Sequence, residues 1–168
     1  NFSEASCVIV KHANPCGVAS SKSVLEAYKK AFACDPTSAF GGIIAVNKEI
    51  DEKTANYLIE NQFIEVVAAP NFTKAAIEQF KSKKNVRLLE VKNQKKINPG
   101  LKFHSVDSGL LVQSIDTGEI ENKNLIVATE KKPNKEELKN AMFAWKVCKY
   151  VKSNAIVYAS KNQTLGIG

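Results

Sequence analysis

The stretch CVIVKHANPCGVA, residues 7–19, decides how the first part of this chain folds. CVIVK is a short apolar run ending in a charge, which predicts a buried β-strand over residues 7–11. The asparagine, proline and glycine of the following HANPCGVA predict a loop. Lys11 and His12 therefore lie at the end of the first predicted strand. In open α/β sheets, ligands bind beyond the carboxyl ends of strands, so this position is a candidate site.

Helical and strand-like patterns alternate after this segment. Helices are predicted at 23–35, 51–61 and 73–82, the first behind the capping box Ser23-x-x-Glu26 and the second behind the capping residue Asp51. Strands are predicted at 43–46, 64–70 and 86–91, and DPTSAFGG (35–42) is predicted as a loop. The order strand, helix, strand indicates an α/β protein with a parallel sheet and helices on its faces.

The pattern changes beyond residue 91. A polar loop is expected at 92–100, strands at 101–106, 109–115, 125–129 and 155–159, and a turn at Asn162-Gln163. Asn134-x-x-Glu137 predicts the start of a helix that runs to about residue 151. The helical spacing places Leu138, Met142, Trp145 and Cys148 on one face, with Trp145 in the core.

The composition excludes several classes of protein. Of the 168 residues, 44% are hydrophobic, and no apolar run reaches the ~18 residues that span a bilayer. The cysteines have no spacing typical of a disulfide framework or a zinc site, which favours reduced thiols and a cytoplasmic protein. A net charge of +7 leaves a basic nucleic-acid-binding module as an alternative function. However, all basic residues except Arg87 are lysines, and we find no clustered aromatic and arginine residues of that class.

Lys11-His12 is the first candidate catalytic pair. Histidine acts as a base near neutral pH, and a neighbouring cation disfavours a second positive charge on the imidazole. Such a pair suits general-base catalysis on a weakly nucleophilic amine. By itself the dipeptide is more often an ordinary surface pair.

The segment NPCG also suggests a zinc-dependent deaminase-like enzyme. That class has His-x-Glu followed by Pro-Cys-x-x-Cys. Here Ala13 and Asn14 follow His12, so the glutamate is missing, and Ala19 stands where the second cysteine is required. The pattern therefore argues against a zinc site.

Three further positions are open to both a functional and a structural interpretation. Ser38–Gly42 is a bendable loop whose glycines allow close approach of a ligand, or it is a plain turn. Glu65 lies among apolar residues and is either a ligand-binding carboxylate or the exposed residue of an alternating strand. Asn154 precedes a strand and either orients a substrate or shapes a helix end.

Six segments together resemble AICAR transformylase, the formyltransferase portion of a bifunctional purine-biosynthesis protein that also carries IMP cyclohydrolase. They are VIVKHANPCGVA (8–19), DPTSAFGGIIA (35–45), FIEVVAAP (63–70), SGLLVQ (108–113), FAWKVCKYVKSNAIVYA (143–159) and TLGIG (164–168). The matching segments occur in order over nearly the whole chain. They are therefore more specific than any single motif.

The resemblance implies a fold and a reaction. The expected fold is a cytidine-deaminase-like three-layer α/β/α sandwich without a zinc site. Residues 1–168 are expected to be the first of two related units, with room for a sub-boundary near 130–134. The expected activity is that of a phosphoribosylaminoimidazolecarboxamide formyltransferase, which moves a formyl group from 10-formyltetrahydrofolate to the 5-amino group of AICAR during IMP biosynthesis. The expected partners are these two small molecules and a second copy in a homodimer, with neither nucleic acid nor membrane.

The resemblance also assigns roles to individual residues. Lys11 and His12 match the catalytic pair: His12 takes the proton from the attacking amine, and Lys11 keeps His12 neutral and stabilises charge on the formyl oxygen. Asn154 matches an asparagine near the reacting amine. Gly41 and Glu65 match contacts to AICAR.

Phe40 and Pro15 are expected to line the folate side. The family's phosphate-binding arginine and its later Phe- and Pro-rich residues follow the equivalent of GIG (166–168), and the family's sites form at a dimer interface. These 168 residues are therefore expected to hold only part of the site.

Overall fold

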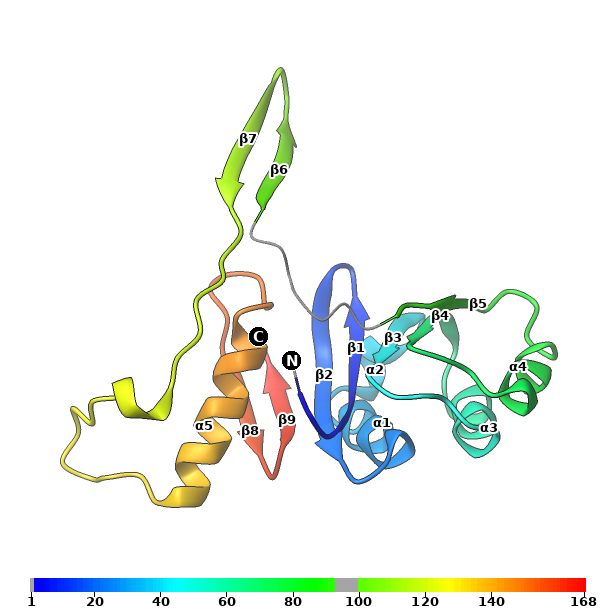
Figure 1. Ribbon diagram of the computed structural model, residues 1–168, viewed down its shortest axis with the longest axis horizontal. Coiled ribbons are helices and arrows are strands. Elements are labelled where there is room, and N and C mark those ends of the chain that lie inside the picture. Colours follow the sequence, from blue (N-terminus) through cyan, green and yellow to red (C-terminus); the bar gives the residue numbers. More distant parts are fainter. Residues whose placement is uncertain (1, 93–99) are drawn as a thin grey trace. The chain divides into compact units, whose positions relative to one another are not determined.

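The computed structural model describes residues 2–92 and 100–168 and divides the chain into two compact units (Figure 1). Unit 1 comprises Asn1–Asn93 and Pro133–Gly168, and unit 2 comprises Gln94–Lys132. The loop predicted at 92–100 lies outside the described residues except at its two ends. Within the described ranges, none of the helices has the length and apolarity needed to cross a membrane.

Unit 1 is a mixed α/β structure built on one seven-stranded sheet with the strand order β5-β4-β3-β1-β2-β9-β8. The strands are β1 (Ala5–Lys11), β2 (Asn14–Ser21), β3 (Gly42–Val46), β4 (Ile64–Ala69), β5 (Arg87–Glu90), β8 (Val157–Ser160) and β9 (Gln163–Ile167). The helices are α1 (Val24–Phe32), α2 (Pro36–Ala39), α3 (Glu52–Asn61), α4 (Lys74–Phe80) and α5 (Lys135–Cys148).

The sheet is mixed, and the prediction of a parallel sheet is wrong for much of it. Only β3, β4 and β5 are parallel neighbours, whereas β1 is antiparallel to both β2 and β3. The reason lies in the segment HANPCGVA (12–19), which was predicted as a loop, whereas most of it belongs to the strand β2. Because β2 pairs directly back onto β1, β1 becomes an antiparallel strand inserted between β2 and β3.

The helices begin where their capping residues predict. Ser23, Asp51 and Thr73 each accept a hydrogen bond from the backbone N–H three residues on, which satisfies an amide that has no partner within the helix. Asn134 and Glu137 form the complete capping box at the start of α5. The predicted loop 35–42 differs, since Asp35 caps the short helix α2 within it.

Two apolar clusters cover opposite faces of the sheet. Ile9 and Ala19 belong to the large cluster, which contains most of the buried residues of α1, α3 and α4. The alternate strand residues Val8 and Val18 pack in the smaller cluster with Phe143 and Val147 of α5. Successive strand residues point to opposite faces, so α5 packs on the face opposite α1.

The prediction for α5 is wrong in its details. The buried residues are Phe143 and Val147, whereas the Trp145 side chain, predicted in the core, is 53% exposed. The apolar spacing of this helix was ambiguous because aromatic or aliphatic residues occupy several faces.

The end of the chain holds a strand that the sequence did not reveal. The turn lies at Lys161 and Asn162, one residue earlier than predicted, and Gln163 begins β9. Thr164 and the Gly-rich residues after it complete this strand, which joins β8 to β2.

Unit 2 contains the antiparallel hairpin of β6 (Leu101–Val106) and β7 (Gly109–Ser114), whose strands lie where the sequence predicts them. A short 3-10 helix covers Asn122–Asn124. The strand predicted at 125–129 is not formed, because these residues pair with no other strand among those the structure describes.

Candidate active site

The turn between β1 and β2 carries His12 at its tip. His12 and Ala13 both have positive φ angles, 50° and 63°, as in the two-residue turns that join twisted antiparallel strands. The left-handed region costs a non-glycine residue about 1–2 kcal/mol. The pairing of Lys11 with Asn14 closes the turn and fixes this conformation. His12 is therefore held exposed at the edge of the sheet.

The Lys11 side chain reaches the loop before β3. Its ammonium nitrogen lies 2.6 Å from the main-chain oxygen of Phe40 and donates a hydrogen bond to it. The next residue, Gly41, has a φ of +66° and donates its N–H to the Phe63 carbonyl at 2.9 Å. A Cβ atom on Gly41 would lie only 2.9 Å from the Lys11 nitrogen, so any other residue would be strained by the backbone angle and would displace the Lys11 ammonium.

Glu65 lies at the same edge. One of its carboxylate oxygens is 3.7 Å from the position of that Gly41 Cβ, so Lys11 and Glu65 flank the glycine. The sheet topology explains this proximity. Because β1 runs antiparallel to β3, and β3 parallel to β4, the carboxyl end of β1 meets the amino ends of β3 and β4.

Phe40 presents an apolar surface beside these polar groups. Its ring stacks on that of Phe63 with 5.1 Å between centroids and an interplanar angle of 27°. The two side chains are 64% and 55% exposed. Exposed stacked rings next to an ammonium and a carboxylate form a surface suited to a planar ligand.

Lys152 joins the segment before β8 to the His12 turn. Its ammonium donates to the His12 carbonyl at 3.0 Å, and its backbone N–H donates to the Asn14 side-chain oxygen at 2.9 Å. Asn154, two residues on, follows a cis peptide bond and is exposed. These two hydrogen bonds bring the segment that carries Asn154 to the turn that carries His12.

Pro15 and Cys16 lie differently. Pro15 is buried in β2 and pairs with Val10 of β1. The Cys16 thiol donates to the Ile9 carbonyl at 3.4 Å, and burial together with the nearby Asp35 raises its pKa to about 11. Across residues 2–92 and 100–168, no group of three or more His, Cys, Asp or Glu side chains is arranged to hold a metal ion.

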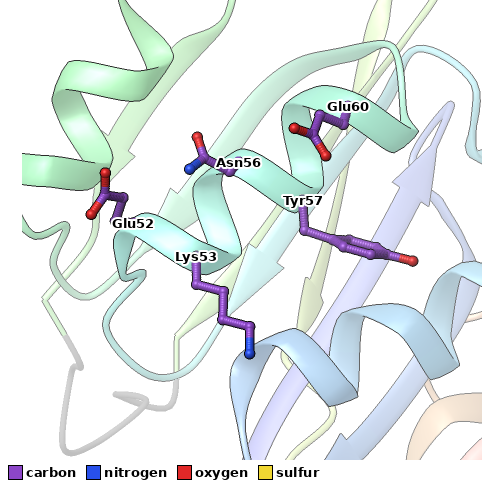
Figure 2. Close-up of a pocket in the computed structure, with 5 residues that line it drawn as sticks. All are labelled: Glu52, Lys53, Asn56, Tyr57 and Glu60. Carbon is purple, nitrogen blue, oxygen red and sulfur yellow. The ribbon is translucent and has the colours of Figure 1, made fainter.

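A separate hollow runs along α3 (Figure 2). The residues that line it, Glu52, Lys53, Asn56, Tyr57 and Glu60, all project from this one helix. Glu52 accepts a hydrogen bond from Gln79 of α4, and Lys29 of α1 lies 4.8 Å from the centre of the Tyr57 ring. None of the residues predicted to be functional lines this hollow.

The structure thus brings Lys11, Phe40, Gly41 and Glu65 into one cluster. Lys152 joins the segment that carries Asn154 to the turn that carries His12.

Sequence reasoning missed Phe63 and Lys152. The signal for Phe63 was an aromatic residue just before a buried strand. No feature of the sequence predicts a role for Lys152, because it is one lysine among many and its hydrogen-bond partners are remote in sequence.

A comparison with protein families gives one match over the whole chain. The family model described as "AICARFT/IMPCHase bienzyme" matches residues 1–168.

Proposed function

Because the chain belongs to the AICARFT/IMPCHase bienzyme family, we propose that this region performs the formyl-transfer step of purine biosynthesis. The proposed reaction transfers the formyl group of 10-formyltetrahydrofolate to the 5-amino group of AICAR. His12 acts as the general base, Lys11 as the electrostatic partner, and Asn154 orients the reacting amine.

The convergence of Lys11, Gly41 and Glu65 is the observation that carries the proposal. These residues come from three separate stretches of sequence and meet at one edge of the sheet. A structural role alone does not require an ammonium, a glycine in the left-handed backbone region and a carboxylate at one point of the sheet. A ligand with both hydrogen-bond donors and a developing negative charge does require such a set.

The chemistry follows from the groups at this edge. The amine nitrogen of AICAR attacks the formyl carbon, and the imidazole of His12 accepts the proton that the nitrogen loses. The formyl oxygen becomes negative in the tetrahedral intermediate, where the Lys11 ammonium stabilises it. The bond from the formyl carbon to N10 of the folate then breaks, and N10 takes up a proton as tetrahydrofolate leaves.

The surrounding residues are assigned to binding. The Gly41 backbone and the Glu65 carboxylate contact AICAR, which offers amine and carboxamide N–H donors. The exposed Phe40 ring lines the folate side, where an aromatic surface suits a flat pterin ring. Pro15 is also assigned to the folate side, and because it is buried in β2, its proposed role is to shape the site from below the surface.

The proposal extends to the architecture. Helices on both faces of the sheet support a three-layer α/β/α sandwich of the cytidine-deaminase-like type. Residues 1–168 then form the first unit of the transformylase domain. In a cytoplasmic homodimer, the phosphate and folate sites are completed by the second of the two related units that the family resemblance implies, which is distinct from unit 2, and by the partner subunit.

The test is a pair of assays on the full-length protein with His12→Ala. The rate of formyl transfer is measured as the formation of tetrahydrofolate. The rate of cyclisation is measured as the formation of IMP from supplied formyl-AICAR. We expect formyl transfer to fall by at least 100-fold, in line with the loss of a general base, while cyclisation stays within about twofold of the wild type. His104→Ala, on the unit 2 hairpin, is the matched control. Near-normal formyl transfer by His12→Ala, or a selective loss of cyclisation, contradicts the proposal.

A further inference from the structure

Gln62 makes two hydrogen bonds behind the candidate site. Its side-chain nitrogen donates to the Ala39 carbonyl at 2.5 Å, and its side-chain oxygen accepts from the Tyr28 hydroxyl at 2.9 Å. A carbonyl oxygen can only accept, so the NH₂ group of the amide must face Ala39. The Tyr28 hydroxyl then completes the pair by donating to the other end of the amide.

Ala39 is the last residue of α2 and leads directly into the loop that receives Lys11. The next carbonyl along the chain, that of Phe40, accepts the Lys11 ammonium at 2.6 Å. The peptide unit of that carbonyl also contains the Gly41 N–H, which donates to Phe63 at 2.9 Å. The pair Gln62-Phe63 therefore holds residues 39–41 at two points, one on each side of the carbonyl that Lys11 contacts.

Tyr28 anchors this arrangement in the core. Tyr28 belongs to α1 and its side chain is completely buried. Its ring packs against those of Phe32 and Tyr57. The three atoms nearest to the Gly41 Cβ position belong to Lys11, Phe63 and Glu65, and neither Tyr28 nor Gln62 supplies one of them. Gln62 therefore acts on this cluster through residues 39–41, to which it bonds, or through Phe63, its neighbour in the chain.

We propose that Gln62 is a positioning residue for formyl transfer, which fixes the loop at residues 39–41 so that the Phe40 carbonyl holds the Lys11 ammonium in place. This inference rests on the proposed function of Lys11. A loop released from Gln62 leaves the Lys11 ammonium with a wider range of positions. Reacting groups misplaced by about 1 Å lose up to 100-fold in rate, whereas binding contacts made elsewhere on the substrate are retained.

The experiment compares Gln62→Met, Tyr28→Phe and Lys11→Met in the full-length enzyme. Methionine keeps the length and volume of glutamine without its hydrogen bonds, and phenylalanine keeps the buried ring. We expect Gln62→Met to lower kcat by about 10-fold and to change KM for AICAR by less than about twofold. Tyr28→Phe, which frees only one end of the amide, lowers kcat by about threefold. Gln79→Met is the matched control, because the Gln79 side chain bonds to Glu52 of α3 instead of to Ala39. The kcat of this variant is expected to stay at the wild-type value.

The two proposals fail in different ways. Wild-type kcat in Gln62→Met, alongside a strong loss in Lys11→Met, overturns the positioning role and leaves the role of Lys11 intact. A rise in KM equal to the fall in kcat/KM also overturns it, because Gln62 then acts on substrate binding. Wild-type kcat in Lys11→Met overturns the proposed function itself. If Gln62→Met does not fold, Tyr28→Phe decides, and unchanged kcat in that variant overturns the positioning role.

Discussion

The ammonium nitrogen of Lys152 lies 3.0 Å from the main-chain oxygen of His12 and donates a hydrogen bond to it, although 140 positions separate the two residues. The backbone N–H of Lys152 also bonds to the Asn14 side chain on the other side of the turn. The β1–β2 turn is thus held by the segment before β8, which lies near the other end of the described chain.

This relationship predicts a catalytic effect of a residue that touches no proposed substrate. In the full-length enzyme, Lys152→Met removes the ammonium but keeps the backbone bond to Asn14. We expect kcat for formyl transfer to fall by about three- to tenfold, the range for one lost hydrogen bond at an exposed site. The control is Lys74→Met at the start of α4. A Lys152→Met enzyme as fast as the control shows that the turn keeps its conformation without the ammonium.

Gly41→Ala tests the close approach at the centre of the cluster. The new Cβ lies 2.9 Å from the Lys11 nitrogen, and the alanine must adopt a φ of +66°. Because the nearest atom is the end of a flexible side chain, we expect a loss of stability of only about 1–2 kcal/mol, mainly from the backbone angle. We expect a loss of kcat of at least 10-fold, because Lys11 must move. Steady-state kinetics and thermal unfolding check the two effects separately, with Gly109→Ala as the control. Wild-type kcat in Gly41→Ala contradicts the assigned role of this position.

The sequence predicted the helix starts better than it predicted the sheet that carries the candidate site. The helix starts at Ser23, Asp51 and Asn134 depend on local side-chain bonds, which a sequence shows directly. The strand at 14–21 contains an asparagine, a proline and a glycine, so local patterns predict a loop. Its pairing with β1 depends on a turn at His12 and Ala13 that contains no glycine.

The cluster itself could not be predicted from the rule for parallel sheets. That rule places sites at the carboxyl ends of strands, yet Gly41 and Glu65 lie at the amino ends of β3 and β4. They meet Lys11 because β1 is antiparallel to β3. The pairing partner of β1 is a long-range property, and only the resemblance to a family, not the periodicity, linked the three residues.

Gly17→Ala tests how α1 is seated on the sheet. A Cβ at Gly17 would lie 2.0 Å from the Ala31 carbonyl oxygen of α1, and backbone atoms cannot move aside as a flexible side chain can. We expect a loss of stability of about 3 kcal/mol or more, at the upper end for overpacked cores, and a large fraction of insoluble protein. Gly166→Ala in β9 is the matched control, because no atom lies within 4 Å of its Cβ position. Equal melting temperatures for the two variants show that α1 shifts without cost.

Thr164→Val tests the side chain that joins β9 to β2. The Thr164 hydroxyl is buried, accepts from the Val18 N–H at 2.9 Å and donates to the Val18 carbonyl at 3.2 Å. Valine keeps the shape but leaves both backbone groups of Val18 without this partner. We expect a loss of about 1–3 kcal/mol by thermal or denaturant unfolding. Thr164→Ser keeps the hydroxyl and is expected to lose less than Thr164→Val; the reverse order shows that packing of the methyl group outweighs the two hydrogen bonds.

The helix caps predict how stability depends on pH. The pKa of Asp35 is lowered by its hydrogen bonds with Ser38, and the pKa of Asp51 is lowered by its hydrogen bonds with Thr54. A pKa that is lower in the folded state than in the unfolded chain means that the carboxylate form stabilises the fold. This stabilisation is complete above the unfolded value of about 4 and is lost as the pH falls through the folded value. Asp51 is exposed and Asp35 is partly exposed, so solvent screening keeps the effect small. Asp51→Asn retains a capping acceptor but cannot titrate. Its melting temperature is expected to fall less than that of the wild type between pH 7 and pH 3. If the melting temperatures of the two proteins fall by the same amount between pH 7 and pH 3, Asp51 does not contribute to the loss of stability in acid.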